Sequence, residues 1–372
     1  MGVDVLADDG FKQLSGKNIG LITNHTGLLS TGESTIDRMH ASSNIRIKAL
    51  FGPEHGVRGS GTTVIADALD DKTGLPVFSL YGPRRAPSQE QIRGIDTFVY
   101  DIQDIGCRYY TYIATLVHCM RSANEAHIPI IVLDRPNPIS GHLVEGPITD
   151  TDKLSFVAIH TIPIRHGLTT GELARLIQKD TLPTVDLRVV LCDGWKRKDW
   201  FHSTGATWID PSPNMRSLIQ ATIYPGPAQL EFTNVSVGRG TPTPFQLFGA
   251  PWIDEHRFAA ALNDLEIDGV GFVPRRFIPT SQPFQQQECR GVEIIVTNMA
   301  MFKPVKTGVA MAITLRKLYP TLWIIDRWQT LLCHQATFDA VSKGADIKTV
   351  EHLWDENLSR YKKRRQSILS YS

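Results

Sequence analysis

The sequence predicts an α/β protein built on a doubly wound, mostly parallel sheet with a second domain attached. The N-terminal part alternates short apolar segments with helical patterns, which is typical of parallel strands joined by helices. Nearly every residue of these segments is apolar, as expected when both faces of a sheet are buried. The length of 372 residues also exceeds what one hydrophobic core usually supports.

Five strands are expected in the N-terminal part, each bounded by Gly, Pro, Asn or Asp. They lie at residues 19–23, 47–51, 77–80, 97–101 and 130–133. The helical patterns lie between these strands, at residues 34–40, 88–93 and 110–127. Strands alternating with helices in this order predict a parallel sheet covered by helices on both faces.

The alternation weakens after Asp134. A helix is expected at 169–178, because Thr169 can cap it and Glu172 occupies the third helical position. A strand at 187–191 is expected to open a second unit. Residues 195–252 are rich in Pro, Gly and Ser and predict long ordered loops, which usually serve function. The remaining elements are expected as follows: strands at 269–273 and 292–296, and a helix at 307–318 stopped by Pro320.

Composition excludes several classes of partner. The 39 Lys and Arg residues balance 38 Asp and Glu residues, so no global field attracts nucleic acid or an anionic membrane. The basic run at 362–365 is interpreted as a solvated last helical turn. The glycine-rich segment 59–63 lacks the P-loop Lys and the GxGxxG spacing, so nucleotide binding is not expected.

Cysteine and histidine spacing predicts neither a cofactor nor a metal. The five cysteines are scattered, odd in number and never spaced as CxxC, which indicates buried free thiols. The histidines form no HExxH pattern. Residues 1–20 contain three aspartates and no continuous apolar run, so neither a signal peptide nor a membrane helix is expected. The chain is expected to be cytoplasmic as written, or periplasmic or secreted if a signal peptide was removed; its oligomeric state is not predicted.

Polar clusters follow the predicted strands almost without intervening sequence. They are NHTG at 24–27, GPEHG at 52–56, YG at 81–82, DIQD at 101–104 and DRPNP at 134–138. Ligands of open α/β sheets bind outside the carboxyl ends of the strands. We therefore expect these clusters to converge on one crevice.

Glu54 is the first candidate for catalysis. Gly52, Pro53 and Gly56 let the backbone turn sharply and expose the Glu54 and His55 side chains at a strand end. Partial burial in a cleft raises the pKa of a carboxyl group and makes it a general acid. Spacing alone is equally compatible with a turn carboxylate that caps a backbone amide.

A second candidate segment is 101–112, where two carboxylates, an Arg and three tyrosines follow a strand. Aromatic rings and carboxylates are the side chains that bind sugars, by stacking and by accepting hydroxyl hydrogen bonds. Alternatively, Asp104 caps the following helix, Arg108 pairs with it and the tyrosines fill the core. We favour functional roles for Asp101 and Arg108, and a core position for Tyr109.

The long loops add Arg239, which stands between two glycines and suits the gripping of a carboxylate. A salt bridge that fixes the loop is an equally good interpretation. His166 and Glu231 are weaker candidates, because polar residues in loops more often satisfy backbone groups.

Eight ordered motifs carry a resemblance to a known family. They are GLITNHTG (20–27), LFGPEHGVRG (50–59), SLYG (79–82), YDIQDIGCRYYTY (100–112), LDRPNPISG (133–141), IPIRHGLTTGELA (162–174), PSPNM (211–215) and SVGRGTPTPF (236–245). Together they resemble the exo-β-N-acetylmuramidase family of glycoside hydrolases, long described as a domain of unknown function. The resemblance runs from about residue 2 to the C-terminus.

The resemblance implies a Rossmann-like catalytic domain, placed at 1–165, and a smaller α+β domain at 166–372 that completes the active-site cleft. It implies release of N-acetylmuramic acid from the non-reducing end of peptidoglycan fragments, with Glu54 at the position of the family's proposed catalytic glutamate. The residues expected to line the sugar subsite are Asn24, His55, Arg108, Tyr110, His166, Glu231 and Arg239. Arg239 and Arg108 are the candidates for binding the lactyl carboxylate of the sugar.

Glu54 is therefore expected to protonate the glycosidic oxygen, with a second group assisting water or stabilising the cation. Asp101, Asp104 and Glu231 are the candidates for that group, and the acetamido group of the substrate is a further alternative. Two other functions stay open: a phosphatase or esterase on the same scaffold, and a non-catalytic muropeptide-binding protein.

Overall fold

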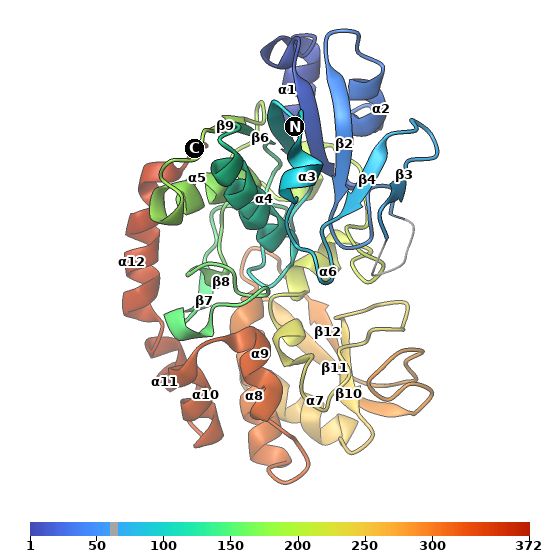
Figure 1. Cartoon of the computed structure of the whole chain (residues 1–372). Helices are drawn as coiled ribbons and strands as arrows, with labels where there is room; N and C mark the ends of the chain where they lie inside the picture. The colour runs from blue at the N-terminus through green and yellow to red at the C-terminus, as the bar shows by residue number, and fades with distance from the viewer. Residues whose placement is uncertain (60–65) are drawn as a thin grey trace.

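The computed structural model describes residues 1–59 and 66–372. It has two parts: a parallel sheet with helices on both faces, and a second part with a small antiparallel sheet and most of the C-terminal helices (Figure 1). Of the glycine-rich segment 59–63, only Gly59 lies within the described residues. No helix in the described ranges is long and apolar enough to cross a membrane.

The large sheet has the strand order β3-β4-β2-β1-β5-β6-β9. Its strands are β1 (Asn18–Thr23), β2 (Arg46–Gly52), β3 (Ala68–Leu69), β4 (Pro76–Ser79), β5 (Thr97–Asp101), β6 (Ile130–Leu133) and β9 (Leu187–Val190). All neighbouring strands are parallel except β3 and β4. The chain winds from β1 to β2 and β4, then returns to β5 on the other side of β1, so the predicted doubly wound sheet is confirmed.

One strand assignment needs correction. The strand expected to open a second unit is β9, which pairs in parallel with β6 over four residues, from Ile130 with Leu187 to Leu133 with Val190. The parallel sheet therefore continues beyond residue 165.

Both faces of the sheet are buried because successive side chains of each strand enter different cores. Ile19 and Leu21 belong to the core beneath α1 (Gly2–Asp8) and α2 (Thr35–His40). Phe98 and Tyr100 belong to the other core. The helices that cover this second face are α3 (Gln89–Ile92), α4 (Tyr112–Ala126) and α5 (Thr170–Thr181). This alternation explains the wholly apolar segments seen in the sequence.

Local sequence signals fix the helix ends. The Thr169 hydroxyl accepts from the Glu172 backbone and the Glu172 side chain accepts from the Thr169 backbone, which is the capping box predicted for α5. Ser88 and Gln91 form the same arrangement at α3. The helix α4 ends at His127, which adopts the left-handed conformation at φ 53°.

The second part contains the antiparallel sheet β10-β12-β11. Its strands are β10 (Leu247–Ala250), β11 (Val270–Phe277) and β12 (Cys289–Val296), and a separate pair is formed by β7 (Glu145–Ile148) and β8 (Pro163–Arg165). Its helices are α6 (Leu218–Ile223), α7 (Glu255–Asn263), α8 (Pro304–Leu318), α9 (Gln329–Leu332), α10 (Gln335–Ser342), α11 (Ile347–His352) and α12 (Asp355–Arg365). The prediction of loops throughout 195–252 was wrong for α6 and β10.

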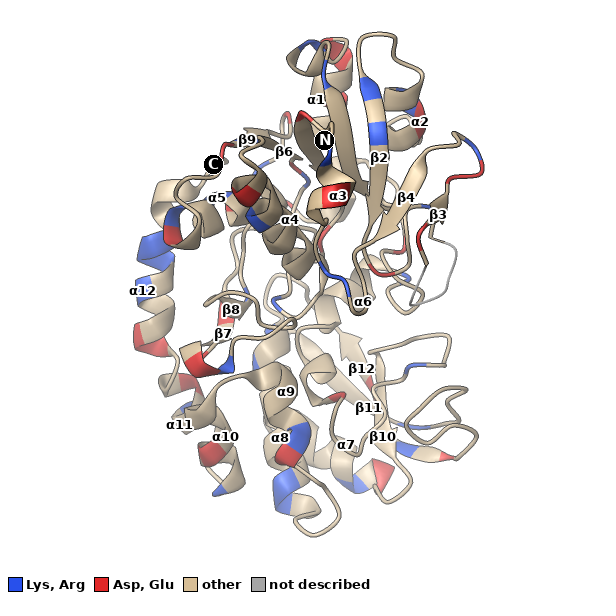
Figure 2. Ribbon diagram, in the orientation of Figure 1, with Lys and Arg blue, Asp and Glu red and all other residues tan. Residues whose placement is uncertain are grey.

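The end of the chain returns to the parallel sheet. The Tyr371 hydroxyl donates to Asp134 Oδ2 at 2.6 Å, and the Ser370 amide donates to Glu172 Oε1 at 2.8 Å. The helix α12, which carries a run of basic side chains in Figure 2, precedes this tail. Its last turn is more than a solvated surface, because Arg364 pairs with Asp180 and Arg365 donates to two backbone carbonyls.

Candidate active site

A pocket of about 260 Å³ is lined by the turns after β2 and β4, by the segment at the start of α4 and by loops of the second part. Five of the residues predicted from the sequence line it: Glu54, His55, Tyr110, Glu231 and Arg239. The sequence interpretation therefore located one real pocket, with contributions from both parts of the molecule.

Glu54 lies in a tight turn directly after β2. The Gly56 amide donates to the Pro53 carbonyl at 3.0 Å, and His55 and Gly56 both have positive φ angles, of 72° and 71°. A Cβ at Gly52 would lie 3.1 Å from Gly56 Cα, so the close approach of the two ends of this turn requires glycine at position 52. The sequence GPEHG thus forms a turn that presents the Glu54 side chain to the pocket.

Two hydroxyl side chains stand beside the Glu54 carboxylate. Thr111 Oγ1 donates to Glu54 Oε2 at 3.1 Å. Tyr81, at the end of β4, lines the same pocket, and its pKa is raised to about 12 by burial and by the negative charge of Glu54. Glu54 is consequently held in place by one neighbour that follows β4 and one that stands at the start of α4.

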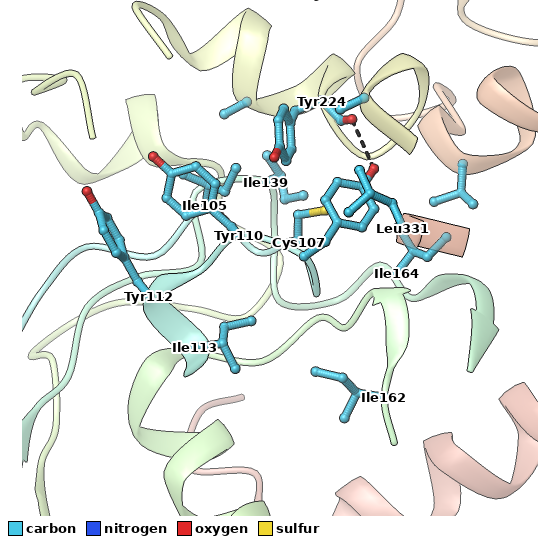
Figure 3. Close-up of a cluster of buried hydrophobic side chains, with 14 of the residues drawn as sticks. Ile105, Cys107, Tyr110, Tyr112, Ile113, Ile139, Ile162, Ile164, Tyr224 and Leu331 are labelled. Atoms are coloured by element: carbon cyan, nitrogen blue, oxygen red, sulfur yellow. Dashed lines mark hydrogen bonds between the residues drawn. The ribbon is translucent and has the colours of Figure 1, made fainter. Parts of the chain in front are cut away.

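A group of tyrosines forms one wall of the pocket. The Tyr110 ring lies 5.0 Å from that of Tyr112 and 5.9 Å from that of Tyr224, both in edge-on geometry. Figure 3 shows these three rings side by side next to Ile105 and Ile139. Burial raises the pKa of the Tyr110 hydroxyl well above its ordinary value. These phenols are neutral at physiological pH and offer apolar faces with polar edges to a ligand.

Glu231 and Arg239 form a two-point ion pair on the opposite wall. Arg239 Nε and Nη2 donate to the two carboxylate oxygens of Glu231 at 2.5 and 3.0 Å. Burial acts to lower the pKa of Arg239, but the charge of Glu231, the hydrogen bonds to it and the nearby Tyr224 and Tyr110 together raise it. The Arg239 guanidinium also lies 5.1 Å from the centre of the Phe245 ring. The salt bridge considered for Arg239 is therefore present, and its partner is itself a predicted site residue.

Asp101, expected to be a catalytic carboxylate, lies outside the pocket and is completely buried. Arg135 Nε and Nη2 donate to its two oxygens at 2.6 and 2.9 Å, and Thr35 Oγ1 donates at 2.6 Å. The carboxylate is enclosed by these donors in the middle of the sheet. Its observed contacts tie β5 to the loop after β6 and to the start of α2.

Asp104 and His166 also lie outside the pocket, in the interior behind it. Asp104 Oδ2 accepts from the Gly106 amide at 2.7 Å and lies 3.6 Å from His166 Nε2, beyond hydrogen-bond distance. His166 Nδ1 accepts from the Leu168 amide at 3.2 Å, which places the ring proton on Nε2. Both side chains hold backbone turns rather than facing the cavity.

Asn24 and Arg108 are likewise buried instead of lining the sugar subsite. Asn24 Oδ1 accepts from the Thr26 amide at 2.9 Å and from its hydroxyl at 2.6 Å, forming a turn after β1. Arg108 Nη2 donates to the carbonyls of Leu331 and Leu332 at 2.6 and 2.8 Å. Burial lowers the pKa of Arg108. This guanidinium joins the loop after β5 to α9 and does not reach the pocket, so it cannot bind a substrate carboxylate there.

Several pocket residues were not singled out from the sequence. They include Tyr81, Thr111, Tyr112, Ser212, Asn214, Tyr224 and Phe232. Ser212 and Asn214 lie in the PSPNM motif and Tyr81 in the SLYG motif, so the ordered motifs held a signal for them that single residues did not. In the described part of the chain, no group of three or more His, Cys, Asp or Glu side chains is arranged to hold a metal ion.

The fold and the pocket define the class of protein. The pocket lies at the carboxyl edge of a doubly wound sheet and contains two carboxylates beside a group of tyrosines. Glu54 stands next to hydroxyl donors, and Glu231 is in an ion pair. Glycosidases use a pair of carboxylates, and the fold is a two-part α/β architecture, so the arrangement matches the class of α/β glycosidases.

The chain belongs to the exo-β-N-acetylmuramidase NamZ family. The family's N-terminal model matches residues 19–219 and its C-terminal model matches residues 222–371. The chain is 40% identical over 375 residues to the peptidoglycan β-N-acetylmuramidase NamZ of Bacillus subtilis (strain 168), covering 100% of this chain and 91% of that protein.

Two solved structures of DUF1343 family proteins from Bacteroides fragilis NCTC 9343 share the fold. One has a TM-score of 0.94 at 35% identity, and the other has a TM-score of 0.79 at 29% identity. Each match covers 100% of this chain and 98% of the other. The family expected from the eight motifs is confirmed.

Proposed function

We propose that this protein is an exo-acting glycoside hydrolase that releases N-acetylmuramic acid from the non-reducing end of peptidoglycan fragments. One observation carries the proposal: Glu54 and Glu231, from different parts of the chain, line the same pocket. The similarity to the Bacillus subtilis peptidoglycan β-N-acetylmuramidase supports the choice of substrate. A pocket of about 260 Å³ holds one terminal sugar rather than a long stretch of glycan, which suits exo action.

In the proposed mechanism, Glu54 is the general acid. It transfers its proton to the glycosidic oxygen as the bond to the anomeric carbon breaks and the sugar gains oxocarbenium character. Thr111 Oγ1, 3.1 Å away, fixes the orientation of the carboxyl group. After the leaving group departs, water attacks the anomeric carbon.

Glu231 is the candidate we favour for the second group. It is the other carboxylate of the pocket, and its two-point pairing with Arg239 fixes the position of both its oxygens. An ionised carboxylate stabilises the cationic sugar and accepts the proton of the attacking water. Asp101 and Asp104, the other two candidates, are enclosed in the interior and are assigned structural roles in this proposal.

Arg239 retains one nitrogen for the substrate. Its Nε and Nη2 are engaged by Glu231, so the lactyl carboxylate of muramic acid is proposed to meet Nη1 in a single contact rather than a two-point one. In this arrangement Arg239 links substrate recognition to the placement of the second carboxylate.

The test of this function is Glu54→Gln, with turnover of a chromogenic N-acetylmuramide as the readout. Loss of a general acid lowers kcat by about 10²–10⁴-fold. The exposed Glu33→Gln is the matched control and should leave kcat unchanged. Near-normal turnover by Glu54→Gln with an unchanged melting temperature would overturn the assignment.

The same incubation separates the two rival functions. A binding protein would retain the intact disaccharide, and mass spectrometry would then show no released sugar. A phosphatase or esterase would act on its own ester substrates and leave the muramide untouched.

A further inference from the structure

A second hollow lies at the switch point of the sheet, apart from the Glu54 pocket. It has a volume of about 320 Å³ and lies at the loops after β1, β5 and β6. Its polar side chains include Gln103 and Arg135, and its apolar walls include Leu28, Phe201 and Trp208. We call it the switch-point chamber. In open α/β sheets this is the place where ligands bind, yet the proposed reaction at Glu54 does not use it.

The chamber offers buried hydrogen-bonding groups without net charge. Arg135 is 4% exposed and is neutralised by Asp101, which occupies its Nε and Nη2. Arg135 lines the chamber, and among the described residues its Nη1 has no hydrogen-bond partner, so this nitrogen remains as a donor. Gln103 is 6% exposed; its amide nitrogen donates to the carbonyls of Asp104 and Pro136, which leaves its oxygen as an acceptor. A fixed donor and a fixed acceptor with no net charge suit a neutral polyhydroxylated ligand.

The chamber also has an aromatic wall suited to a sugar ring. Trp208 is partly exposed, and its Nε1 donates to the Met215 carbonyl at 3.2 Å, which fixes the indole. Phe201 packs edge-on against it with ring centres 5.3 Å apart. A rigid aromatic face beside hydrogen-bonding groups is the arrangement that recognises a pyranose.

The segment 206–214 connects the chamber with the Glu54 pocket. A smaller hollow of about 240 Å³ shares His55 and Ser212 with the Glu54 pocket and shares Ile209 with the chamber. Neighbouring strands are about 5 Å apart, so the end of β5 lies roughly 10 Å from the end of β2. The three hollows are thus neighbours along the carboxyl edge of the sheet, with wall residues in common.

We propose that the switch-point chamber binds a neutral N-acetylglucosamine ring of the leaving glycan. This inference rests on the proposed glycosidase function, because it makes the chamber a site for the part of the substrate that departs. The chamber then selects longer fragments, while the Glu54 pocket selects the terminal sugar.

The experiment blocks the chamber without touching Glu54. Thr207 and Thr31 are exposed residues that line the chamber. In the variants Thr207→Trp and Thr31→Trp, the larger side chain is expected to occupy the chamber. His202→Trp is the matched control, since His202 is exposed on the neighbouring helical turn at Phe201–Thr204 and lines none of the three hollows. The substrates are the chromogenic muramide and muramyl-terminated glycans of increasing length.

For the wild type, kcat/KM should rise about tenfold once the glycan is long enough to fill the chamber. A rise of this size corresponds to the binding free energy of one or two new contacts. Both blocking variants should lose this rise and keep wild-type kcat/KM on the chromogenic muramide, and His202→Trp should retain it. Equal kcat/KM at every length in the wild type, or an undiminished rise in both blocking variants, would overturn the proposal. Failure of the muramidase function is distinguishable, because the wild type would then not turn over the muramide at all.

Discussion

Replacement of Asp101 by Asn distinguishes a structural carboxylate from a catalytic one. The carboxylate is 0% exposed and its partner Arg135 is 4% exposed, so the variant leaves a buried guanidinium without its counter-charge. Breaking a buried ion pair by removing one partner costs roughly 3–5 kcal/mol in free energy of unfolding. Each kcal/mol corresponds to roughly 2–4 °C in a domain of this size, so Tm should fall by roughly 6–20 °C.

Thermal unfolding and turnover are measured on the same preparations. We expect Asp101→Asn to unfold at lower temperature but to retain kcat within a few-fold of wild type well below its transition. Asp71→Asn, a change at an exposed carboxylate, should alter neither quantity. The structural reasoning is refuted if Asp101→Asn keeps the wild-type Tm and loses more than about 10²-fold in kcat, since that pattern belongs to a catalytic acid or base.

Two further predictions concern pH and the neighbours of Glu54. Burial raises the pKa of Asp134 to about 6 and that of Glu145 to about 7. The folded chain therefore binds more protons than the unfolded chain between about pH 4 and pH 7, and its free energy of unfolding falls as pH rises through this window. Glu145→Gln should reduce that fall when urea unfolding is compared at about pH 5 and pH 7, and an unchanged slope would contradict it. Tyr81→Phe removes a hydroxyl beside Glu54 and should lower kcat by about tenfold and move the pH profile of kcat upward; an unaltered profile would assign Tyr81 to packing alone.

The strands could be predicted because burial on both faces of the sheet produces short, mostly apolar segments in the sequence. Segments such as 97–101 and 130–133 are mostly apolar and completely buried, and the structure places strands at these same residues. The helix α6 and the strand β10 were missed because they are short and lie among Pro and Gly residues. Contacts with distant parts of the chain stabilise them, and periodicity in a short segment cannot reveal such contacts.

The candidate site was only partly predictable for a related reason. The rule that strand ends converge gives the edge of the sheet where hollows form. It does not say which side chains face a cavity. Glu54 and Asp101 both stand at the ends of central strands. Glu54 lies in the pocket beside Thr111, whereas Arg135 and Thr35 enclose Asp101. Partners of Asp101 that are 34 and 66 residues away in sequence decide its environment, and no local pattern announces them.

The contact between Tyr371 and Asp134 has a consequence for how the molecule is made. Asp134 follows β6, the neighbour of the edge strand β9, while Tyr371 lies 237 residues further along the chain. During synthesis from the N-terminus, the sheet emerges from the ribosome long before the side chain that completes this buried hydrogen bond. The sheet region thus reaches its final stability only after residues far downstream have been made, so the folding of these two distant segments is coupled.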